Sequence, residues 1–254
     1  MAYYGQRGRA GVHLPFNFQL VEAPWDASAL RTMIAAYEAA LPPGGWPNWV
    51  IASHDYPRIA AKLGEAQARV AAMLLLTLRG TPTLYQGYEL GIGRVVIAPD
   101  QVQDPKEQRE PGIGLGRDPS RTPMAWDGSP HAGFSSVEPW LPLHVDWPVR
   151  NVAGQTSDPG SMLSLYRALL ALRRAEPALS TGSFRLIDAD ADILAYERQY
   201  GDARLLVALN LSDSPRTLAP PAGTRAVPLL STLTRPLLDG SLRPNEGIIV
   251  KLED

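Results

Sequence analysis

The sequence has no cysteine, no long apolar run and almost no excess of either charge. Without cysteine the protein forms no disulfide and uses no thiolate, and such a composition favours a reducing, cytoplasmic location. No apolar stretch approaches the roughly 20 residues that cross a bilayer, and the residues from Met1 to Arg7 lack the apolar core of a signal peptide. The 24 Lys and Arg residues and the 26 Asp and Glu residues leave a net charge of −2. This balance predicts a neutral substrate, with neither nucleic acid nor a membrane as partner.

Signals for several common kinds of site are also absent. The four histidines do not have the spacing of metal ligands. The glycine-rich residues 112–116 do not open a helix after a strand, as a phosphate-binding loop would. The Gly-x-Ser-x-Gly pattern of a serine hydrolase does not occur. We therefore expect no metal and no cofactor.

Hydrophobic patterning in the first part of the 254-residue chain predicts strands that alternate with helices. The first helix opens with Asp26 as its N-cap and ends before the Pro-Gly residues 42–45. A second helix is predicted over 64–78. The predicted strands are 12–20, 49–52 and 81–85. Strands that are separated by single helices run parallel with right-handed crossovers, which predicts an α/β arrangement.

The pattern changes twice after residue 90. Residues 91–157 lack periodicity and are rich in Pro, Gly, Asp and Arg, which is typical of a long functional loop. A helix follows, with Asp158 as its N-cap, and ends before Pro177. We place a domain boundary at Pro177, with an α/β domain at 1–177 and a small antiparallel β domain at 178–254. The strands of the β domain are predicted at 183–187, 193–199, 204–211, 225–231 and 247–252.

Residues 46–58, WPNWVIASHDYPR, combine a short buried strand with polar side chains. The apolar run ends in four polar or ionisable residues, which are Ser53, His54, Asp55 and Arg58. Enzymes of the α/β class place their functional groups at the carboxyl ends of strands. The alternative is a surface turn in which Pro57 fixes the backbone and Arg58 neutralises Asp55. From this stretch alone the turn is the better interpretation.

Residues 46–58 resemble the strand-seven motif of the α-amylase family of glycoside hydrolases, most closely its α-glucosidase and oligo-1,6-glucosidase branch. Four further stretches resemble this branch in the same order: 13–20 (HLPFNFQL), 77–89 (TLRGTPTLYQGYE), 117–127 (RDPSRTPMAWD) and 129–135 (SPHAGFS). The resemblance covers nearly the whole chain and implies the last three strands and helices of a (β/α)8 barrel, followed by a β-sandwich. Five barrel strands, with the family's nucleophile and general acid, lie upstream of everything present. The resemblance therefore implies a missing N-terminal barrel half as partner.

The resemblance also assigns roles to individual residues. It makes Asp55 the third carboxylate, which stabilises the oxocarbenium-like transition state of a retaining glycosidase. It makes His54 a hydrogen-bond partner of sugar hydroxyls, although Ser53 stands where the branch commonly has asparagine. Arg121 reaches the same subsite in the matching motif, where Ala125 here replaces a glutamine. The alternative for Arg121 is a surface salt bridge.

Three more residues have a structural interpretation, and Phe16 has a substrate-binding interpretation as well. The ring of Phe16 fits an apolar wall for a sugar face, together with Phe18, but alternating aromatics are more often core residues. Glu89 is predicted to be a structural carboxylate near the end of the third strand. Arg58 is predicted to pair with a carboxylate of the barrel and not to contact substrate.

We therefore expect the carboxyl-terminal portion of an α-glucosidase-like enzyme that cleaves α-glucosidic bonds in short, neutral oligosaccharides or disaccharides. Because the nucleophile and general acid are absent, this portion is expected to be inactive alone. One alternative in the same family is a transglycosylase or an isomerase that acts on trehalose or sucrose. Another is a non-catalytic remnant that binds carbohydrate or packs against a partner. The family's transporter-associated branch is disfavoured by the lack of a membrane span.

Overall fold

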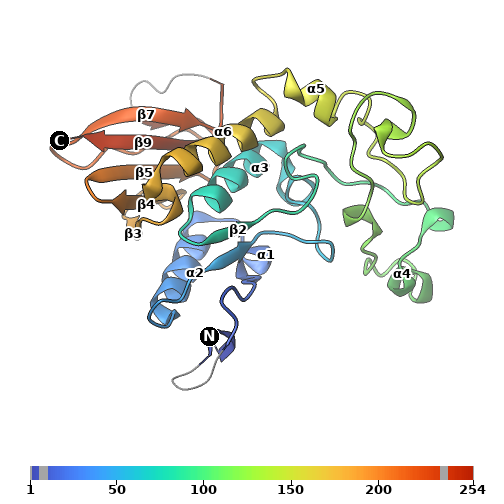
Figure 1. Ribbon diagram of the computed structural model, residues 1–254, viewed down its shortest axis with the longest axis horizontal. Helices are drawn as coiled ribbons and strands as arrows, with labels where there is room; N and C mark the ends of the chain where they lie inside the picture. The colour runs from blue at the N-terminus through green and yellow to red at the C-terminus, as the bar shows by residue number, and fades with distance from the viewer. Residues whose placement is uncertain (1, 6–10, 235–239, 254) are drawn as a thin grey trace. The chain divides into compact units, whose positions relative to one another are not determined.

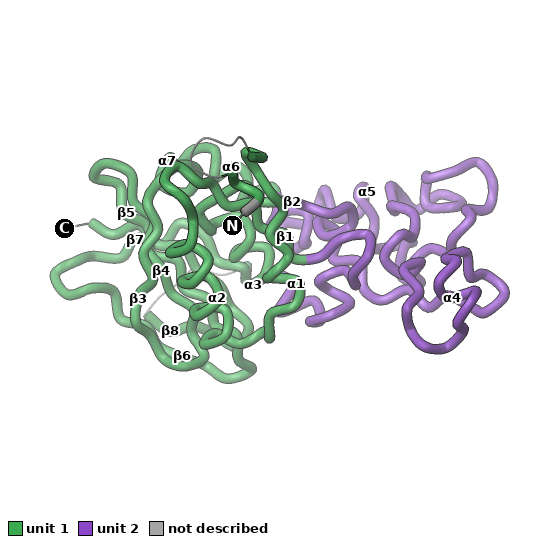
Figure 2. The backbone as a smooth tube through the Cα atoms, turned by 90° about the horizontal axis from the view of Figure 1, so that it is seen from below, with its two compact units in different colours: residues 1–51, 69–83, 167–254 green, residues 52–68, 84–166 purple. Residues whose placement is uncertain are grey.

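The computed structural model describes residues 2–5, 11–234 and 240–253. The chain divides into two compact units, which are coloured separately in Figure 2. Unit 1 comprises 1–51, 69–83 and 167–254, and unit 2 comprises 52–68 and 84–166. Two helices, α3 (Ile59–Thr77) and α6 (Met162–Ala175), contribute residues to both units.

The α/β elements of unit 1 follow the predicted order. Helix α2 (Ala27–Ala40) begins where the Asp26 carboxylate accepts a hydrogen bond from the Ala29 N–H at 2.8 Å, so the predicted N-cap is confirmed. Strand β1 (Asn48–Val50) pairs with β2 (Thr81–Thr83) in parallel, in agreement with the predicted parallel arrangement. Trp49, in the middle of β1, is fully buried. A short 3-10 helix, η1 (Ala2–Tyr4), precedes these elements.

The strand predicted over 12–20 is wrong. Only Asn17 pairs with a strand, through an isolated parallel bridge to Trp49, and the chain then enters α1 (Gln19–Glu22). The Asn17 side chain accepts the Gln19 N–H at 3.0 Å, which turns the backbone away from an extended course. Phe16 and Phe18 are consequently exposed, at 61% and 42%.

Two helix boundaries also differ from the prediction. Helix α3 begins at Ile59, before the predicted start, and Gly64 interrupts it with a non-helical φ of 76° that suits glycine. Helix α6 begins at Met162, later than predicted. Its first turn is capped by Ser161, whose hydroxyl accepts the Ser164 N–H at 3.1 Å. The predicted cap Asp158 instead forms a local turn, accepting the Gly160 N–H.

The end of the chain forms an antiparallel sheet, as predicted, and Figure 1 shows its strands beside one another. The strand order is β3-β4-β5-β9-β7. A two-residue turn joins β4 to β5, where Gly201 supplies the positive φ of 57° that such hairpins require. The bounds are Ser183–Ile187 for β3, Ile193–Tyr200 for β4, Ala203–Asn210 for β5, Arg225–Ser231 for β7 and Gly247–Glu253 for β9.

The two faces of this sheet are covered differently. One face packs on a second, two-stranded sheet of β6 (Arg216–Thr217) and β8 (Ser241–Leu242), from which Leu242 is fully buried. On the other face, Leu205 packs against the short helix α7 (Pro177–Ser180). Because successive side chains of a strand point to opposite faces, β4 and β5 contribute apolar side chains to both faces of the sheet. The apolar cluster under the second sheet contains Ile193, Ala195, Leu206, Ala208, Ile248, Val250 and Leu252.

Unit 2 contains short helices joined by long irregular segments. Its longest continuous elements between 91 and 157 have five residues, and a small apolar cluster of Leu90, Ile92, Val95 and Leu163 forms one core. The elements are η2 (Pro99–Gln101), α4 (Pro105–Arg109), η3 (Asp118–Ser120), η4 (Pro130–Gly133) and α5 (Val152–Thr156). Nowhere in the described residues is a helix both long and apolar enough to cross a bilayer.

A buried arginine in unit 1 ties together several segments. The guanidinium of Arg198 on β4 donates hydrogen bonds to the main-chain oxygens of four residues, which are Thr77, Leu179, Gly182 and Ser183. Desolvation lowers the pKa of Arg198 to about 10, so the side chain stays charged at neutral pH. Because Thr77 ends α3 and Leu179 lies in α7, this one side chain links α3, α7 and the sheet.

We predict that Arg198→Met destabilises the chain by roughly 3 kcal/mol, because it leaves buried carbonyl groups without donors. Urea denaturation followed by circular dichroism measures the loss. Arg185→Met on β3 is the matched control, because the Arg185 side chain is 62% exposed and its partner Glu197 keeps a second arginine partner, Arg204. Its effect should stay within about 0.5 kcal/mol. Equal losses in the two variants would contradict the role given to Arg198.

Candidate functional site

His54 and Asp55 follow β1 closely in the chain and lie in a tight turn. The Tyr56 N–H donates to the Ser53 carbonyl at 3.3 Å, and the Asp55 N–H donates to the Ser53 hydroxyl at 3.1 Å. Ser53 therefore supplies a side-chain acceptor that holds the turn. The turn presents both functional side chains to solvent, with 62% of the His54 side chain and 45% of the Asp55 side chain exposed.

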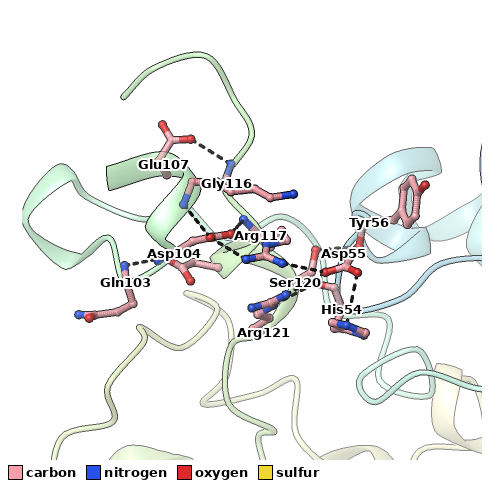
Figure 3. Close-up of polar contacts among 12 residues, drawn as sticks. His54, Asp55, Tyr56, Gln103, Asp104, Glu107, Gly116, Arg117, Ser120 and Arg121 are labelled. Carbon is pink, nitrogen blue, oxygen red and sulfur yellow. Dashed lines mark hydrogen bonds and ion pairs between the residues drawn. The ribbon is translucent and has the colours of Figure 1, made fainter. Parts of the chain in front are cut away.

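Three cationic or ionisable nitrogens surround the Asp55 carboxylate (Figure 3). Arg121 Nη2 lies 2.8 Å from Oδ1, and Arg117 Nη1 lies 3.4 Å from the same oxygen. His54 Nε2 lies 3.4 Å from Oδ2. Both carboxylate oxygens therefore face positive or polar groups on unit 2.

This surrounding field keeps Asp55 ionised. Desolvation alone would raise the pKa of the carboxyl group, but the hydrogen bond from Arg121 and the charges of His54 and Arg117 outweigh it, and the pKa falls below its ordinary value. Asp55 is thus an anion in the neutral range and does not act as a proton donor there. A fixed negative charge can stabilise a positive charge that develops nearby.

A buried carboxylate holds Arg117 in place. Arg117 Nε and Nη2 donate to the two oxygens of Asp104, at 2.6 and 2.8 Å, in a bidentate pair. The Asp104 side chain is fully buried, and the hydrogen bond from Arg117 holds the pKa of its carboxyl group far below the ordinary value. Asp118 in turn accepts the Gln103 and Asp104 N–H groups and orders the backbone here.

Sequence reasoning missed Arg117 as a member of the site. A usable signal was present, because Arg117 and Arg121 flank the three-residue helix η3 and are four positions apart. One helical turn brings such a pair to the same side. Arg121 lies close to Asp55, and its Nε also donates to the His54 carbonyl at 3.1 Å.

Within these 254 residues Arg58 neither neutralises Asp55 nor forms the predicted carboxylate pair. Its side chain is buried, 1% exposed, and therefore does not neutralise Asp55 at the surface. Among the described residues it also pairs with no carboxylate. The guanidinium donates instead to main-chain oxygens and to the hydroxyl of Thr122. Arg117 and Arg121 take over the neutralisation of Asp55.

Two cavities of unit 2 adjoin these groups. The first, about 720 Å³, includes Asp55 and Arg117 in its wall, with Arg58, Lys62, Arg94 and Lys106 as further cationic residues. The second, about 450 Å³, includes Arg121 and an aromatic rim of Trp126, Phe134 and Trp140. Glu89 also borders it while accepting the Gly87 N–H at 2.9 Å, which agrees with a structural carboxylate.

Phe16 belongs to unit 1, whereas His54, Asp55 and Arg121 belong to unit 2. Its ring contacts Phe18, with centroids 5.9 Å apart, and it is 61% exposed in these 254 residues. Within the described residues no group of three or more His, Asp or Glu side chains is arranged to hold a metal ion.

Family models match the chain in two parts. The model of the α-amylase catalytic domain matches residues 1–182, and a domain of unknown function, DUF3459, matches residues 180–247. Maltase A1 of Drosophila melanogaster is 33% identical over 254 residues, which covers 95% of this chain and 44% of the maltase.

Solved structures also resemble this chain over nearly its whole length. An α-glucosyl transfer enzyme, XgtA, matches with a TM-score of 0.88 and 34% identity, over 99% of this chain and 48% of that one. The trehalulose synthase MutB from Pseudomonas mesoacidophila MX-45 matches with a TM-score of 0.86 and 30% identity, over 97% of this chain and 52% of that one. The chain therefore spans about half the length of these relatives. From the catalytic-domain match and the identity to the maltase, this chain belongs to the α-amylase family.

Proposed function

We propose that this chain is the carboxyl-terminal portion of an α-glucosidase-like retaining glycoside hydrolase that acts on α-glucosidic bonds of short oligosaccharides. The observation that carries the proposal is the half-exposed Asp55 carboxylate, held ionised by Arg117, Arg121 and His54 at the wall of a 720 Å³ cavity. A carboxylate in this state suits the third acidic role of the family, which stabilises the transition state without transferring a proton.

Electrostatics supports this role for Asp55. The oxocarbenium-like transition state of glycoside cleavage carries positive charge on the sugar ring. A preorganised anion near the ring therefore lowers the energy of the transition state more than that of the neutral substrate. The two arginines hold the carboxylate through one oxygen, Oδ1, and the other oxygen faces His54.

His54, Arg121 and Phe16 are the proposed substrate-binding residues. The imidazole of His54 is largely exposed, so it is accessible to sugar hydroxyls. The planar guanidinium of Arg121 can donate to hydroxyl oxygens as well as to Asp55. The exposed ring of Phe16 favours the sugar-wall interpretation over the core interpretation.

The names of the relatives support α-glucoside chemistry. They include Maltase A1 and an α-glucosyl transfer enzyme, and one MutB structure holds the substrate sucrose. The similarity to XgtA and to the trehalulose synthase MutB also favours a second candidate function, α-glucosyl transfer or isomerisation of a disaccharide such as sucrose. A non-catalytic remnant is the remaining alternative.

The architecture belongs to the same proposal. Residues 1–177 would form the carboxyl-terminal part of a (β/α)8 barrel, and 178–254 would form the β-sandwich domain. The matches at 1–182 and 180–247 support a boundary in this region. The parallel pair β1–β2 supports two barrel strands. The nucleophile and general acid would come from a segment outside these 254 residues, on this or another chain.

In an enzyme assembled with that segment, Asp55→Asn should lower kcat/KM on a p-nitrophenyl α-glucoside by about 100-fold or more. The amide keeps the shape of the side chain and removes the charge that stabilises the transition state. Asp100→Asn, which changes an exposed carboxylate of η2, is the control and should leave kcat/KM unchanged. Retention of more than a tenth of the wild-type value in Asp55→Asn would disprove the role.

Arg121→Lys should raise KM or lower kcat in the same assembled enzyme, by about tenfold, because an ammonium group cannot reproduce the guanidinium fork. Arg109→Lys in α4 is the matched control, because Arg109 is exposed. Steady-state kinetics on maltose separates the two parameters. Wild-type kinetics in Arg121→Lys would return Arg121 to the surface salt-bridge interpretation.

The 254 residues by themselves should not hydrolyse glycosides, because Asp55 supplies neither a nucleophile nor a proton donor. The test is to purify the chain free of host α-glucosidase and to assay maltose, isomaltose and an aryl α-glucoside. Hydrolysis that Asp55→Asn abolishes would refute the prediction, since the chain would then contain a complete site.

A further inference from the structure

Arg58 joins three segments of unit 2 through its guanidinium group. Nη1 donates to the Pro119 carbonyl at 3.2 Å and to the Thr122 hydroxyl at 2.8 Å, and Nη2 donates to the Thr122 carbonyl at 3.0 Å. Nε donates to the Gln86 carbonyl at 3.3 Å. Arg58 therefore connects its own turn with the segment after β2 and with residues 119–122.

The backbone around Arg58 fixes where this guanidinium lies. The Arg58 carbonyl accepts the N–H groups of Ala61 and Lys62 at the start of α3. Gly87 packs against the side chain so closely that a Cβ atom there would lie 3.0 Å from Arg58 Nε. Gly87 also has a φ of +88°, which L side chains rarely adopt. Glycine at this position makes room for the arginine.

The segment held by Arg58 is the one that delivers two arginines to Asp55. Arg117 and Arg121 lie on either side of η3, and Pro119 belongs to that helix. Two further hydrogen bonds support the same segment. The Ser120 hydroxyl donates to the Tyr56 carbonyl, and the Ser120 carbonyl accepts from the Tyr85 hydroxyl, both at 2.8 Å. Arg58 contributes three hydrogen bonds from a fully desolvated position, where a charged donor is strongest.

We propose that Arg58 is a positioning residue of the Asp55 site: it anchors residues 119–122 and thereby holds Arg117 and Arg121 against the Asp55 carboxylate. Any effect of Arg58 on glycoside cleavage rests on the proposed function. The anchoring itself is a property of the 254-residue chain. Arg58 does not touch Asp55, and the groups that face that carboxylate are His54, Arg117 and Arg121.

The pKa of Asp55 provides the measurement, because it responds to the distance of the arginines. Nuclear magnetic resonance of the chain labelled with ¹³C at aspartate carboxyl groups follows each titration, and Asp55→Asn identifies the Asp55 signal. Arg58→Lys keeps the positive charge but cannot donate to Gln86, Pro119 and Thr122 together. We expect the pKa of Asp55 to rise in Arg58→Lys toward its ordinary value.

A mutant cycle tests whether Arg58 acts through the two arginines. In a background with Arg117→Gln and Arg121→Gln, the pKa of Asp55 should already be raised, and adding Arg58→Lys should not raise it further. Arg150→Lys is the matched control. Arg150 is another arginine of unit 2 that donates to a loop carbonyl, that of Leu90, and it pairs with Asp146 and Glu65. Its replacement should leave the Asp55 titration unchanged.

A wild-type Asp55 titration in folded Arg58→Lys would overturn the proposal. A further rise when Arg58→Lys is added to the double-variant background would overturn it too, because Arg58 would then act on Asp55 directly. If Arg58→Lys does not fold, Thr122→Val removes one acceptor with little change of shape, and an unchanged titration in that variant is equally decisive. These outcomes concern the chain alone, so they are independent of the activity test on Asp55→Asn.

Discussion

The ion-pair cluster Asp104–Arg117–Asp55–Arg121 is the interaction on which the candidate site depends. Asp104 is fully buried and satisfied by Arg117, so it acts as a fixed anchor beneath the surface. Arg117 extends from this anchor to Asp55, which Arg121 contacts from the same segment. The result is a half-exposed carboxylate whose pKa is lowered by two partly buried arginines, one of which is anchored on a buried carboxylate. Such preorganisation is what electrostatic stabilisation of a transition state requires.

Buried arginines that donate to main-chain oxygens recur in both units. In unit 2, Arg58 joins the segments around the site, and in unit 1, Arg198 joins α3, α7 and the sheet. In the part of the chain that the structure describes, neither arginine has a carboxylate partner. A guanidinium has five N–H donors in a rigid plane, so it can satisfy several carbonyls from irregular segments at once. This is how a chain with long loops satisfies buried backbone oxygens that no helix or strand can pair.

Much of the fold was predictable from local pattern. Helix α2, with its cap at Asp26, and the strands β3 and β7 have the expected positions, because capping chemistry and alternation act over a few residues. The strand expected over 12–20 failed because a side-chain hydrogen bond from Asn17 competed with the alternating pattern. The helix start at Asp158 failed because Ser161 offered a competing cap three residues later.

The sequence by itself determined the family motifs, the neutral charge balance and the choice of His54, Asp55 and Arg121 as candidates, since residue types in a fixed local order carry that information. Tertiary structure decided which charges meet. Arg58 stands three residues from Asp55 in the chain, yet it is buried against carbonyls from distant segments, while Arg117 reaches Asp55 across 62 positions. The position of a guanidinium depends on the balance between the free energy of desolvation and the hydrogen bonds that offset it. That balance is set by the packing of distant segments, which the local sequence does not encode.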